Sequence, residues 1–323
     1  MITHRKCCEN VNQIEVTVIC IAYNHEKYIR NALDGFVNQK TNFQYEVLIH
    51  DDASTDNTAK IIREFEEKYP NIIKPIYQTE NQYSKGVRII QSILLPFAQG
   101  KYIALCEGDD YWTDSQKLQK QFDFMESHKD ASACFHNGLV NDVKCGNKYV
   151  VPNVKQITKY SFDDIVMGRD GLFVTSSTFC RKEYYKTPDE FRLKGVGDFQ
   201  LFVSLASSGS VYCLSDIMST YVNGREGSWT EKILLDEKLA ANHRLVMVDL
   251  LCIMDKYYNY SHHDAFQYKI DWQLFQYFKL RKCENEIKQK SFQKFFPVKK
   301  KKPLQRRIKK WVKQRFFSLH SNK

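Results

Sequence analysis

The stretch VTVICIAYN, Val16 to Asn24, is a nearly continuous apolar run that ends in a tyrosine and an asparagine. Such a run is typical of a β-strand that is covered on both faces, as in a parallel sheet. The apolar residues that follow are spaced by three and by one along the chain. They are Ile29, Ala32, Leu33, Phe36 and Val37. This spacing predicts one buried face of a helix, so the chain begins with a strand followed by a helix.

The same alternation continues through the first half of the chain. Further strands are predicted by the runs YEVLIHDD (45–52), IIKPIY (72–77) and KYIALC (101–106). Helical patterns cover residues 56–70, 87–97 and 114–128. Strands that alternate with helices predict an α/β fold, in which helices cover both faces of a parallel sheet.

The second half of the sequence is less regular. Strands are predicted over residues 171–185 and 209–222, and helices over residues 231–256 and 264–290. No Gly-, Pro- or Ser-rich linker divides the two halves. The sequence therefore favours one mixed-sheet domain with a helical C-terminal extension.

Polar side chains follow three of the predicted strands at the point where each strand ends. They are Tyr23, Asn24 and His25; Asp51 and Asp52; and Glu107, Asp109 and Asp110. Open α/β sheets bind ligands at the carboxyl ends of their strands, near the point where the strand order reverses. If these strands are parallel neighbours, their polar ends converge on one crevice, which is the predicted binding site.

The acidic turn, residues 107–110 of the stretch ALCEGDDYWTD (104–114), places three carboxylates within four residues. Carboxylates crowded at the edge of a core repel one another, so the turn predicts a cationic partner. Oxygen ligands on a short loop suit Mg²⁺ or Mn²⁺, which keep open positions for phosphate oxygens. A solvated turn before a helix N-terminus explains the same residues without a metal.

The segment HDDASTDNT, residues 50–58, has two readings as well. It is an Asp-rich turn that caps the following helix, or it places Asp51 and Asp52 where they accept hydrogen bonds from a base and a ribose. The first reading explains Asp56 well. It explains Asp51 and Asp52 less well, because both come directly after an apolar strand.

Several classes of protein are excluded or disfavoured by the composition. The chain lacks GxGxxG, GxxxxGK[ST] and GxSxG motifs, so dinucleotide, P-loop and serine-hydrolase sites are not predicted. The ten cysteines are scattered and form no CxxC pair, which indicates reduced thiols. No apolar segment has the length of a signal peptide or of a membrane span, which predicts a cytoplasmic protein.

The net charge of +10 is concentrated at the C-terminus. Residues 294–323 hold 12 of the 48 Lys and Arg residues and no acid, so the remainder carries 36 basic against 38 acidic residues. A globally basic surface for nucleic acid is therefore not supported. The end of the chain, residues 293–323, has the pattern of a basic amphipathic helix with Trp311 and Phe residues, which suits an anionic membrane surface. A solvated tail or a nucleic-acid contact explains the same charges.

The ordered motifs ICIAYN, LIHDDASTDNT, TENQYSKG and YIALCEGDDYWTDSQKLQKQ resemble the nucleotide-binding half of family 2 glycosyltransferases with the GT-A fold. The resemblance covers residues 16–135 and continues more weakly to residue 229. It implies a glycosyltransferase domain over residues 1–230, with a nucleotide-binding half at 15–135 and an acceptor half at 136–230. The helical extension then covers residues 231–292.

The resemblance also implies roles for the polar strand ends. Ala22, Tyr23 and Asn24 would line the nucleotide pocket, with Tyr23 against the base, and Asp51 or Asp52 would meet base and ribose. Asp52 is the predicted base contact. Glu107, Gly108 and Asp109 occupy the place of the family's DxD motif, where Glu107 replaces the usual first Asp. Asp109 is the first predicted metal ligand and Asp110 the second.

In the acceptor half, Asp198 matches the position of the family's acidic base, although a helix N-cap explains it as well. Arg225 and Trp229 lie in a segment similar to the loop that closes over the diphosphate, or in an ordinary turn with Gly224 and Gly227. Residues 175–178 are predicted to face the acceptor. The QxxRW motif of processive synthases is absent, which predicts the addition of a single sugar.

Together the resemblance implies an inverting, metal-dependent transferase that uses Mn²⁺ or Mg²⁺. The expected donor is a UDP- or dTDP-linked sugar, and the acceptor is a hydroxyl of a glycan or a lipid-linked saccharide in cell-surface polysaccharide synthesis. The expected location is the inner face of the cell membrane. A non-catalytic nucleotide-sugar or glycan binding protein on the same fold is the alternative, and the sequence does not determine the oligomeric state.

Overall fold

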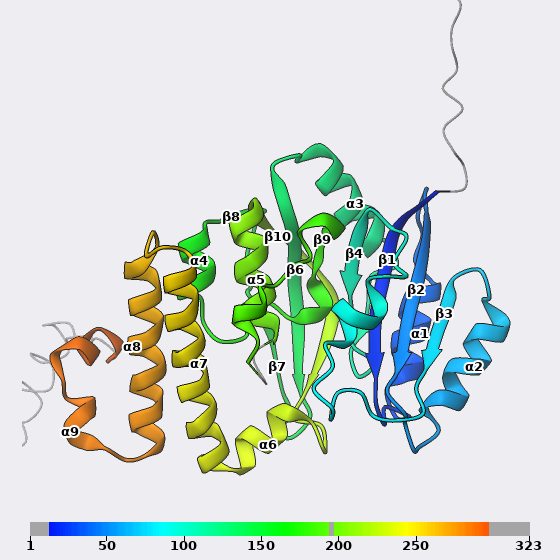
Figure 1. The fold of residues 1–323 in the computed structure, drawn as a ribbon. Coiled ribbons are helices and arrows are strands. Elements are labelled where there is room, and N and C mark those ends of the chain that lie inside the picture. The colour runs from blue at the N-terminus through cyan, green and yellow to red at the C-terminus, as the bar shows by residue number, and fades with distance from the viewer. Residues whose placement is uncertain (1–12, 194–196, 297–323) are drawn as a thin grey trace, which may run out of the picture.

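A computed structural model describes residues 13–193 and 197–296 of the chain. The described residues form one ten-stranded sheet, with helices packed along it (Figure 1). The strands are β1 (Ile14–Ala22), β2 (Gln44–Asp51), β3 (Ile73–Tyr77), β4 (Tyr102–Leu105), β5 (Tyr111–Trp112), β6 (Ala131–Asp142), β7 (Asn147–Val151), β8 (Thr158–Tyr160), β9 (Phe179–Arg181) and β10 (Ser210–Asn223).

The helices follow the strands in sequence and cover the two faces of the sheet. The α-helices are α1 (Ile29–Val37), α2 (Thr58–Lys68), α3 (Lys117–Ser127), α4 (Phe162–Met167), α5 (Gly197–Ser208), α6 (Trp229–Leu235), α7 (Glu237–Tyr257), α8 (His263–Leu280) and α9 (Glu284–Ile287). Shorter helical turns are η1 (Ile90–Leu94), η2 (Thr175–Ser177), η3 (Lys182–Tyr184), η4 (Asp189–Phe191) and η5 (Lys290–Phe295).

The sheet is parallel at one end and mixed at the other. Its strand order is β3-β2-β1-β4-β9-β6-β10-β5, with β7 beside β6 and β8 beside β10. The first four strands in this order are parallel neighbours. Strand β9 runs antiparallel to both β4 and β6, so β6 and β10 have the direction of β4. The prediction of an α/β mixed sheet is confirmed, and the ends of β1, β2 and β4 lie at one edge.

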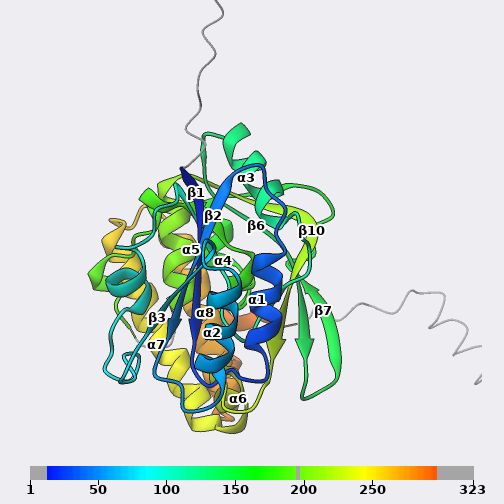
Figure 2. The same ribbon diagram turned by 90° about the vertical axis from the view of Figure 1, so that its right-hand side faces the viewer.

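The core has two parts, one on each face of the sheet. Along β1, Val16, Val18 and Cys20 pack with α1, α2 and α3. Ile19 of the same strand belongs to the core cluster of the opposite face, which also contains residues of α5, α7 and α8. Figure 2, which looks onto the β3 edge, shows α1 and α5 on the two sides of the strands. Alternate side chains of a strand point to opposite faces, and this explains why most of β1 is apolar.

Several predicted elements differ from the structure in length. Instead of a helix over residues 87–97, the chain forms only the π-helical turn η1 at Ile90–Leu94. The strand predicted over residues 171–185 is reduced to β9, and η2 and η3 flank it. The predicted helix over residues 264–290 ends as α8 at Leu280. These segments are apolar because neighbouring elements bury them, so apolarity alone did not define their conformation.

The helical extension forms one end of the molecule. Helices α7 and α8 lie side by side beyond α4 and α5, at the end of the molecule opposite β3 (Figure 1). Lys269 of α8 is buried and donates to Asp170, which also accepts from Arg244 of α7. This cluster connects both helices to the segment before η2. None of the helices in the described ranges has both the length and the apolarity to cross a membrane.

A buried polar ladder attaches α3 to the sheet. Lys117 is fully buried, and its Nζ donates to Gln121 Oε1 at 2.7 Å. Gln121 Nε2 in turn donates to the carbonyl oxygens of Cys134 and Ser177, both at 3.0 Å. The Lys117 ammonium lies 4.1 Å from the centroid of the Trp112 ring. Burial lowers the pKa of Lys117 from 10.5 to about 7, because the charged form loses its hydration.

This buried lysine predicts an unusual pH dependence of stability. Between about pH 7 and pH 10.5 the unfolded chain holds one more proton than the folded chain, so stability rises with pH, by up to about 1.4 kcal/mol per unit. We expect the free energy of unfolding, measured with urea, to rise by about 1 to 2 kcal/mol from pH 7 to 8.5. The measurements stop at pH 8.5 because cysteine thiols ionise above about that pH and would add a pH dependence of their own.

The substitution Lys117→Met is expected to remove this slope. The matched control is Lys120→Met, because Lys120 lies on the same helix, pairs with Asp114 and Asp216 at the surface, and has a pKa above its usual value. It should keep the slope. An equal slope in the parent and in Lys117→Met would show that the buried ammonium keeps its proton.

Candidate active site

A cleft of about 1250 Å³ opens beside the carboxyl ends of β1 and β4. Its walls come from the acidic turn, residues 83–91, the start of α5 and the segment from the end of β10 into α6. Six residues that the sequence singled out line this cleft together. They are Glu107, Asp109, Thr175, Asp198, Arg225 and Trp229. They come from segments that are far apart in the chain, so the sheet topology is what brings them to one place.

The acidic turn is held against the end of β1 by backbone hydrogen bonds. The amide of Cys106 donates to the Ile19 carbonyl at 3.1 Å, and the amide of Gly108 donates to the Ile21 carbonyl at 2.9 Å. A Cβ atom on Gly108 would lie 2.8 Å from Ile29 Cδ1 and 2.9 Å from His25 Nδ1. Only glycine allows so close an approach, and the carboxylates on both sides of it are thereby placed at the strand end.

The three carboxylates of the turn face different surroundings. Glu107 points into the cleft, where water reaches it, yet burial of its carboxyl group and the charges of Asp109 and Asp198 raise its pKa to about 8. Asp109 is only 6% exposed. Its Oδ2 pairs with Arg225, and its Oδ1 is buried without a partner. The turn therefore presents one ion-paired and one protonatable carboxylate to the cleft.

Asp110 points away from the cleft. Its Oδ1 accepts from the amide of Val222 at 3.0 Å, which fastens the turn to β10, and its Oδ2 is buried and unpartnered. Burial and the neighbouring charges of Asp109 and Glu107 raise its pKa well above the usual value. Asp110 does not line the cleft, so the structure gives no support to its role as the second metal ligand.

Arg225 reaches the acidic turn from the end of β10. Its Nε donates to Asp109 Oδ2, and its Nη2 donates to His25 Nε2 at 2.9 Å. His25 lies just after β1 and is 6% exposed, and burial lowers its pKa. His25 is one of the polar strand-end residues that the sequence predicts at the crevice, but no separate role was predicted for it.

Asp198 lies at the start of α5 and lines the same cleft, near enough to Glu107 for its charge to raise the pKa of that carboxyl group. Thr175 Oγ1 donates to Asp198 Oδ2 at 2.8 Å. Burial of the carboxyl group raises its pKa above the usual value, and the hydrogen bond from Thr175 opposes that rise. Thr175 lines the cleft, as predicted. Residues 176–178 do not, because all three are buried beneath it, and Ser176 bonds to Ser219 of β10.

The residues predicted to hold the nucleotide have other contacts in this structure. Asp52 is buried, and its two oxygens accept from the amides of Gln82 and Tyr83 at 2.7 and 3.1 Å. It therefore fixes the segment that forms one wall of the cleft. Asp51 is also buried, and its Oδ1 has no partner. Of the two, Asp51 has the free acceptor that a base or ribose contact needs.

The remaining strand-end residues hold the framework. Asn24 has φ 54° and its Oδ1 accepts from the amide of Thr55 at 2.8 Å, which joins the ends of β1 and β2. Ala22 is fully buried beneath Gly108. Tyr23 is 43% exposed and is not among the residues that line the cleft. Its predicted stacking on the base stays a prediction.

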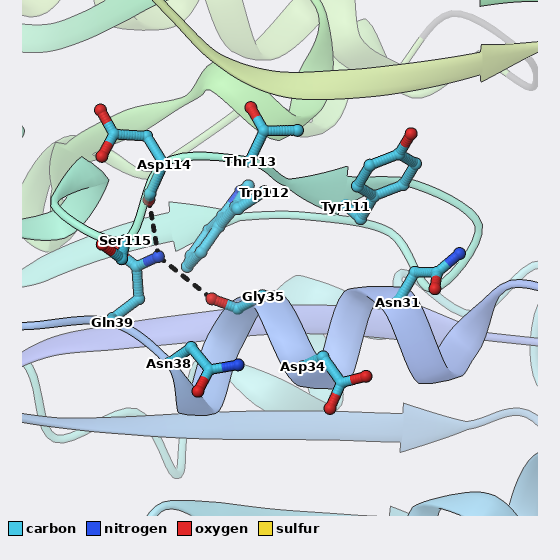
Figure 3. Close-up of a pocket in the computed structure, with 10 residues that line it drawn as sticks. All are labelled: Asn31, Asp34, Gly35, Asn38, Gln39, Tyr111, Trp112, Thr113, Asp114 and Ser115. Atoms are coloured by element: carbon cyan, nitrogen blue, oxygen red, sulfur yellow. Dashed lines mark hydrogen bonds between the residues drawn. The ribbon is translucent and has the colours of Figure 1, made fainter.

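A second pocket of about 420 Å³ lies between α1 and residues 111–115 (Figure 3). It shares no lining residue with the cleft. Gln39 supports it: its Nε2 donates to the carbonyls of Gly35 and Asp114, and its Oε1 accepts from the amide of Leu118. The side-chain amide of Gln39 thus joins the end of α1 to the start of α3, and it holds in place the segment that follows the acidic turn.

The cleft has donor atoms that fit a divalent ion. Within residues 13–193 and 197–296, no three His, Cys, Asp or Glu side chains form a full ligand set. A small hard cation is nevertheless commonly held by one or two carboxylates, with phosphate oxygens and water in the other positions. The unpartnered, buried Oδ1 of Asp109 is an atom of this kind. Asp109 thus fits a metal ligand, with Glu107 beside it in the cleft.

A mixed sheet with an acidic turn at the end of β4, and with helices on both faces, is the GT-A architecture of glycosyltransferases. A family model described as glycosyl transferase family 2 matches residues 17–181. The chain belongs to this family. The match covers β1 to β9 and ends before Asp198 and Arg225, so the part of the cleft formed by α5 and the segment after β10 lies outside it.

Relatives and solved structures agree with this assignment. The chain is 36% identical over 215 residues to the uncharacterized protein Rv1520 of Mycobacterium tuberculosis, which is 66% of this chain and 60% of that protein. It is 25% identical over 247 residues to the Escherichia coli protein named UDP-Glc:alpha-D-GlcNAc-diphosphoundecaprenol beta-1,3-glucosyltransferase WfaP, which is 72% of this chain and 90% of that one. The chain thus spans less than two thirds of the mycobacterial relative.

Two solved structures share the fold at low identity. The Staphylococcus aureus TarS 1–349 complex with UDP superposes with a TM-score of 0.56 and 18% identity, over 82% of this chain and 72% of that one. The Pyrobaculum calidifontis mannosyltransferase PcManGT, in complex with GDP-Man and Mn²⁺, superposes with a TM-score of 0.55 and 16% identity, over 84% and 75%. The GT-A fold predicted from the sequence is confirmed.

Proposed function

We propose that this protein is a metal-dependent, inverting glycosyltransferase that moves a single sugar from a UDP- or dTDP-linked donor to a hydroxyl group. The acceptor is a glycan or a lipid-linked saccharide of a cell-surface polysaccharide. The observation that carries this proposal is the shared cleft: Asp109 and Arg225 lie on the wall next to the strand ends, and Asp198 lies on the wall formed by α5. One wall suits the diphosphate of a donor, and the other suits an acceptor.

The residues of the cleft divide the chemistry between them. Asp198 takes the proton of the acceptor hydroxyl, while the acceptor oxygen forms a bond to the anomeric carbon. The bond from that carbon to the diphosphate oxygen breaks on the opposite face, and its electron pair leaves with the diphosphate. Arg225 offers a guanidinium to the leaving phosphate. A divalent ion held by Asp109 would stabilise the same negative charge as a Lewis acid.

The donor class rests on the relatives. The name of WfaP gives a UDP-linked sugar as its donor and a diphosphoundecaprenol-linked sugar as its acceptor. TarS was solved with UDP. PcManGT was solved with GDP-Man, so the fold accepts more than one base. For this chain, Asp51 is the acidic residue at the end of β2 with an unpartnered oxygen, and we assign it the contact with the base or ribose.

The proposal is tested by donor binding and turnover with the full-length protein. We expect one uridine or thymidine sugar, added with Mn²⁺, to raise the melting temperature, because a ligand that binds only the folded state stabilises it by mass action. EDTA should remove this shift. The same donor, given with a membrane extract as the source of acceptor, should be consumed with release of its nucleoside diphosphate. No shift with any donor at millimolar concentration would contradict the proposal.

The basic tail stays a separate prediction. Residues 297–323 lie outside the described residues, and the proposed contact with an anionic membrane surface depends on them. Truncation after Phe296 is the variant that separates membrane binding from donor binding. It should abolish sedimentation with anionic vesicles and leave the donor-dependent melting shift unchanged.

A further inference from the structure

The guanidinium of Arg225 lies between Asp109 of the acidic turn and His25 at the end of β1. Its side chain is 15% exposed and that of Asp109 is 8% exposed, so the pair is largely shielded from water. Nε donates to Asp109, and Nη2 donates to His25. One guanidinium thus joins the acidic turn to the end of β1. Arg225 lies 116 positions after Asp109 and 200 positions after His25 in the sequence.

The two acceptors of this guanidinium are also donor atoms of the kind that bind transition metals. His25 Nε2 accepts a hydrogen bond, so it carries a lone pair directed at the position of Arg225. Asp109 contributes a carboxylate whose second oxygen is buried and unpartnered. A carboxylate oxygen with a neutral imidazole nitrogen beside it suits a divalent transition-metal ion such as Mn²⁺, which prefers oxygen ligands and also accepts an imidazole nitrogen.

The position of His25 is fixed before any ligand binds. Its amide donates to Thr58 Oγ1 at 2.7 Å, and its carbonyl accepts from the amides of Tyr28 and Ile29. Its ring packs close to Gly108, where even a methyl group would clash with Nδ1. A ring held in this way loses little conformational entropy when it becomes a ligand.

We propose that Arg225 is an internal stand-in for the divalent ion, and that it gives up Asp109 and His25 to the ion when the metal binds. Asp109 and His25 Nε2 then become the two protein ligands. This inference rests on the proposed function, since it assumes that the site takes a metal, and it adds His25 as a ligand and Arg225 as a competitor.

The charges of the cleft make this exchange reasonable. Four acids line it, namely Glu107, Asp109, Asp170 and Asp198. A guanidinium and a divalent ion repel each other, so they do not share Asp109 and His25. Arg225 stands between Gly224 and Gly227, whose φ angles are 75° and 76°. Glycine adopts such angles without the steric strain that a side chain would cause, so the backbone on both sides of Arg225 can change conformation. Released Arg225 stays in the cleft, where phosphate oxygens offer it a new partner.

Metal selectivity follows from the same two ligands. Mg²⁺ prefers oxygen ligands and near-octahedral geometry, whereas Mn²⁺ accepts an imidazole nitrogen more readily. We expect the protein to bind Mn²⁺ more tightly than Mg²⁺. The preference should shrink in His25→Ala, because that variant leaves only oxygen ligands.

The test uses Mn²⁺ alone, with no donor and no acceptor. Free Mn²⁺ is counted by electron paramagnetic resonance during titration of the full-length protein. We expect Arg225→Gln to bind Mn²⁺ roughly tenfold more tightly than the parent, because the competing charge is gone. Adding His25→Ala to that variant should cancel the gain. Arg192→Gln is the matched control, because Arg192 lines the same cleft and its side chain donates to the Gly86 carbonyl and, among the described residues, to neither Asp109 nor His25. It should leave the affinity unchanged.

A melting experiment in EDTA gives a second reading of the same exchange. Arg225→Gln leaves buried Asp109 without a cation, so it should melt at a lower temperature than the parent in EDTA and recover the loss in Mn²⁺. If Arg225→Gln binds Mn²⁺ no more tightly than the parent, the stand-in role is overturned. If His25→Asn and His25→Ala, both shown to be folded by circular dichroism, bind Mn²⁺ as tightly as the same protein with His25 in place, His25 is not a ligand.

These outcomes are distinguishable from a failure of the proposed function. If the protein binds Mn²⁺ as described but turns over no nucleotide sugar, the exchange is supported and the transferase function is contradicted. If the protein transfers sugar but its Mn²⁺ affinity does not depend on Arg225 and His25, the function is supported and the exchange is contradicted.

Discussion

Asp198→Asn is expected to slow sugar transfer by about 10³-fold, while the affinity for the donor changes by no more than about twofold. An asparagine fills the same space and still accepts the hydrogen bond from Thr175, but it cannot take a proton from the acceptor hydroxyl. The donor is expected to bind at the opposite wall, at Asp109 and Arg225, which the substitution does not touch. Turnover and the donor-dependent melting shift, measured on the same preparation, check both parts.

The hydrogen bond from Thr175 supplies a control on this assignment. It stabilises the ionised form of Asp198 and holds its pKa down, against the rise caused by burial. Thr175→Val should therefore raise that pKa and move the acid limb of the pH–rate profile to higher pH. The plateau rate at high pH should change much less than in Asp198→Asn.

Two results would contradict the role of Asp198. Full activity in Asp198→Asn would place the base elsewhere, and Glu107 is then the first carboxylate in the cleft to examine. A donor that binds to the parent with no turnover, in any acceptor preparation, would favour the non-catalytic binding protein on the same fold. In that case Asp198 would serve only at the start of α5.

Asp109→Asn is expected to reduce transfer by about 10³-fold and to remove the Mn²⁺-dependent part of donor binding. The reason is that Asp109 holds the one buried, unpartnered carboxylate oxygen that lines the cleft among the described residues. An asparagine keeps the shape but removes the charge that a divalent ion needs. Turnover with saturating donor, and melting with donor in Mn²⁺ or in EDTA, are the measurements.

Asp110→Asn is the matched comparison, because it makes the same change one residue away. Asp110 bonds to the amide of Val222 and does not line the cleft. We expect this variant to change the melting temperature and to keep the Mn²⁺-dependent shift with the donor. Loss of the Mn²⁺ effect in Asp110→Asn, with Asp109→Asn unaffected, would show that the ion binds at Asp110.

The sequence predicted the strand and helix order of the first half well. The pattern of β1 reflects burial on both faces, and the stripe Ile29, Ala32, Leu33 and Phe36 is the buried face of α1. Helix α3 was predicted from Leu118, Phe122 and Met125; Leu118 and Met125 are fully buried, and Phe122 is partly buried against the same core. These patterns are local, because backbone geometry repeats every two residues in a strand and every 3.6 in a helix.

Other features escaped the sequence because they depend on distant partners. Lys117 and Gln121 are polar residues of α3, yet the ladder to Cys134 and Ser177 buries both. The helix expected over residues 87–97 is reduced to the turn η1, and the segment forms a wall of the cleft. The sequence did not show that Asp52, the predicted base contact, accepts hydrogen bonds from the amides of Gln82 and Tyr83.

The sequence by itself determined the class of fold and the crevice at the strand ends, because apolar periodicity and strand-end polarity are properties of short segments. Only the tertiary structure decided that Asp109, and not its neighbour Asp110, lines the cleft. Asp109 meets Arg225 and Asp110 meets the amide of Val222, more than 100 positions away along the chain. Neighbouring side chains of a turn point in different directions, and contacts from a remote strand decide which of them faces the cleft.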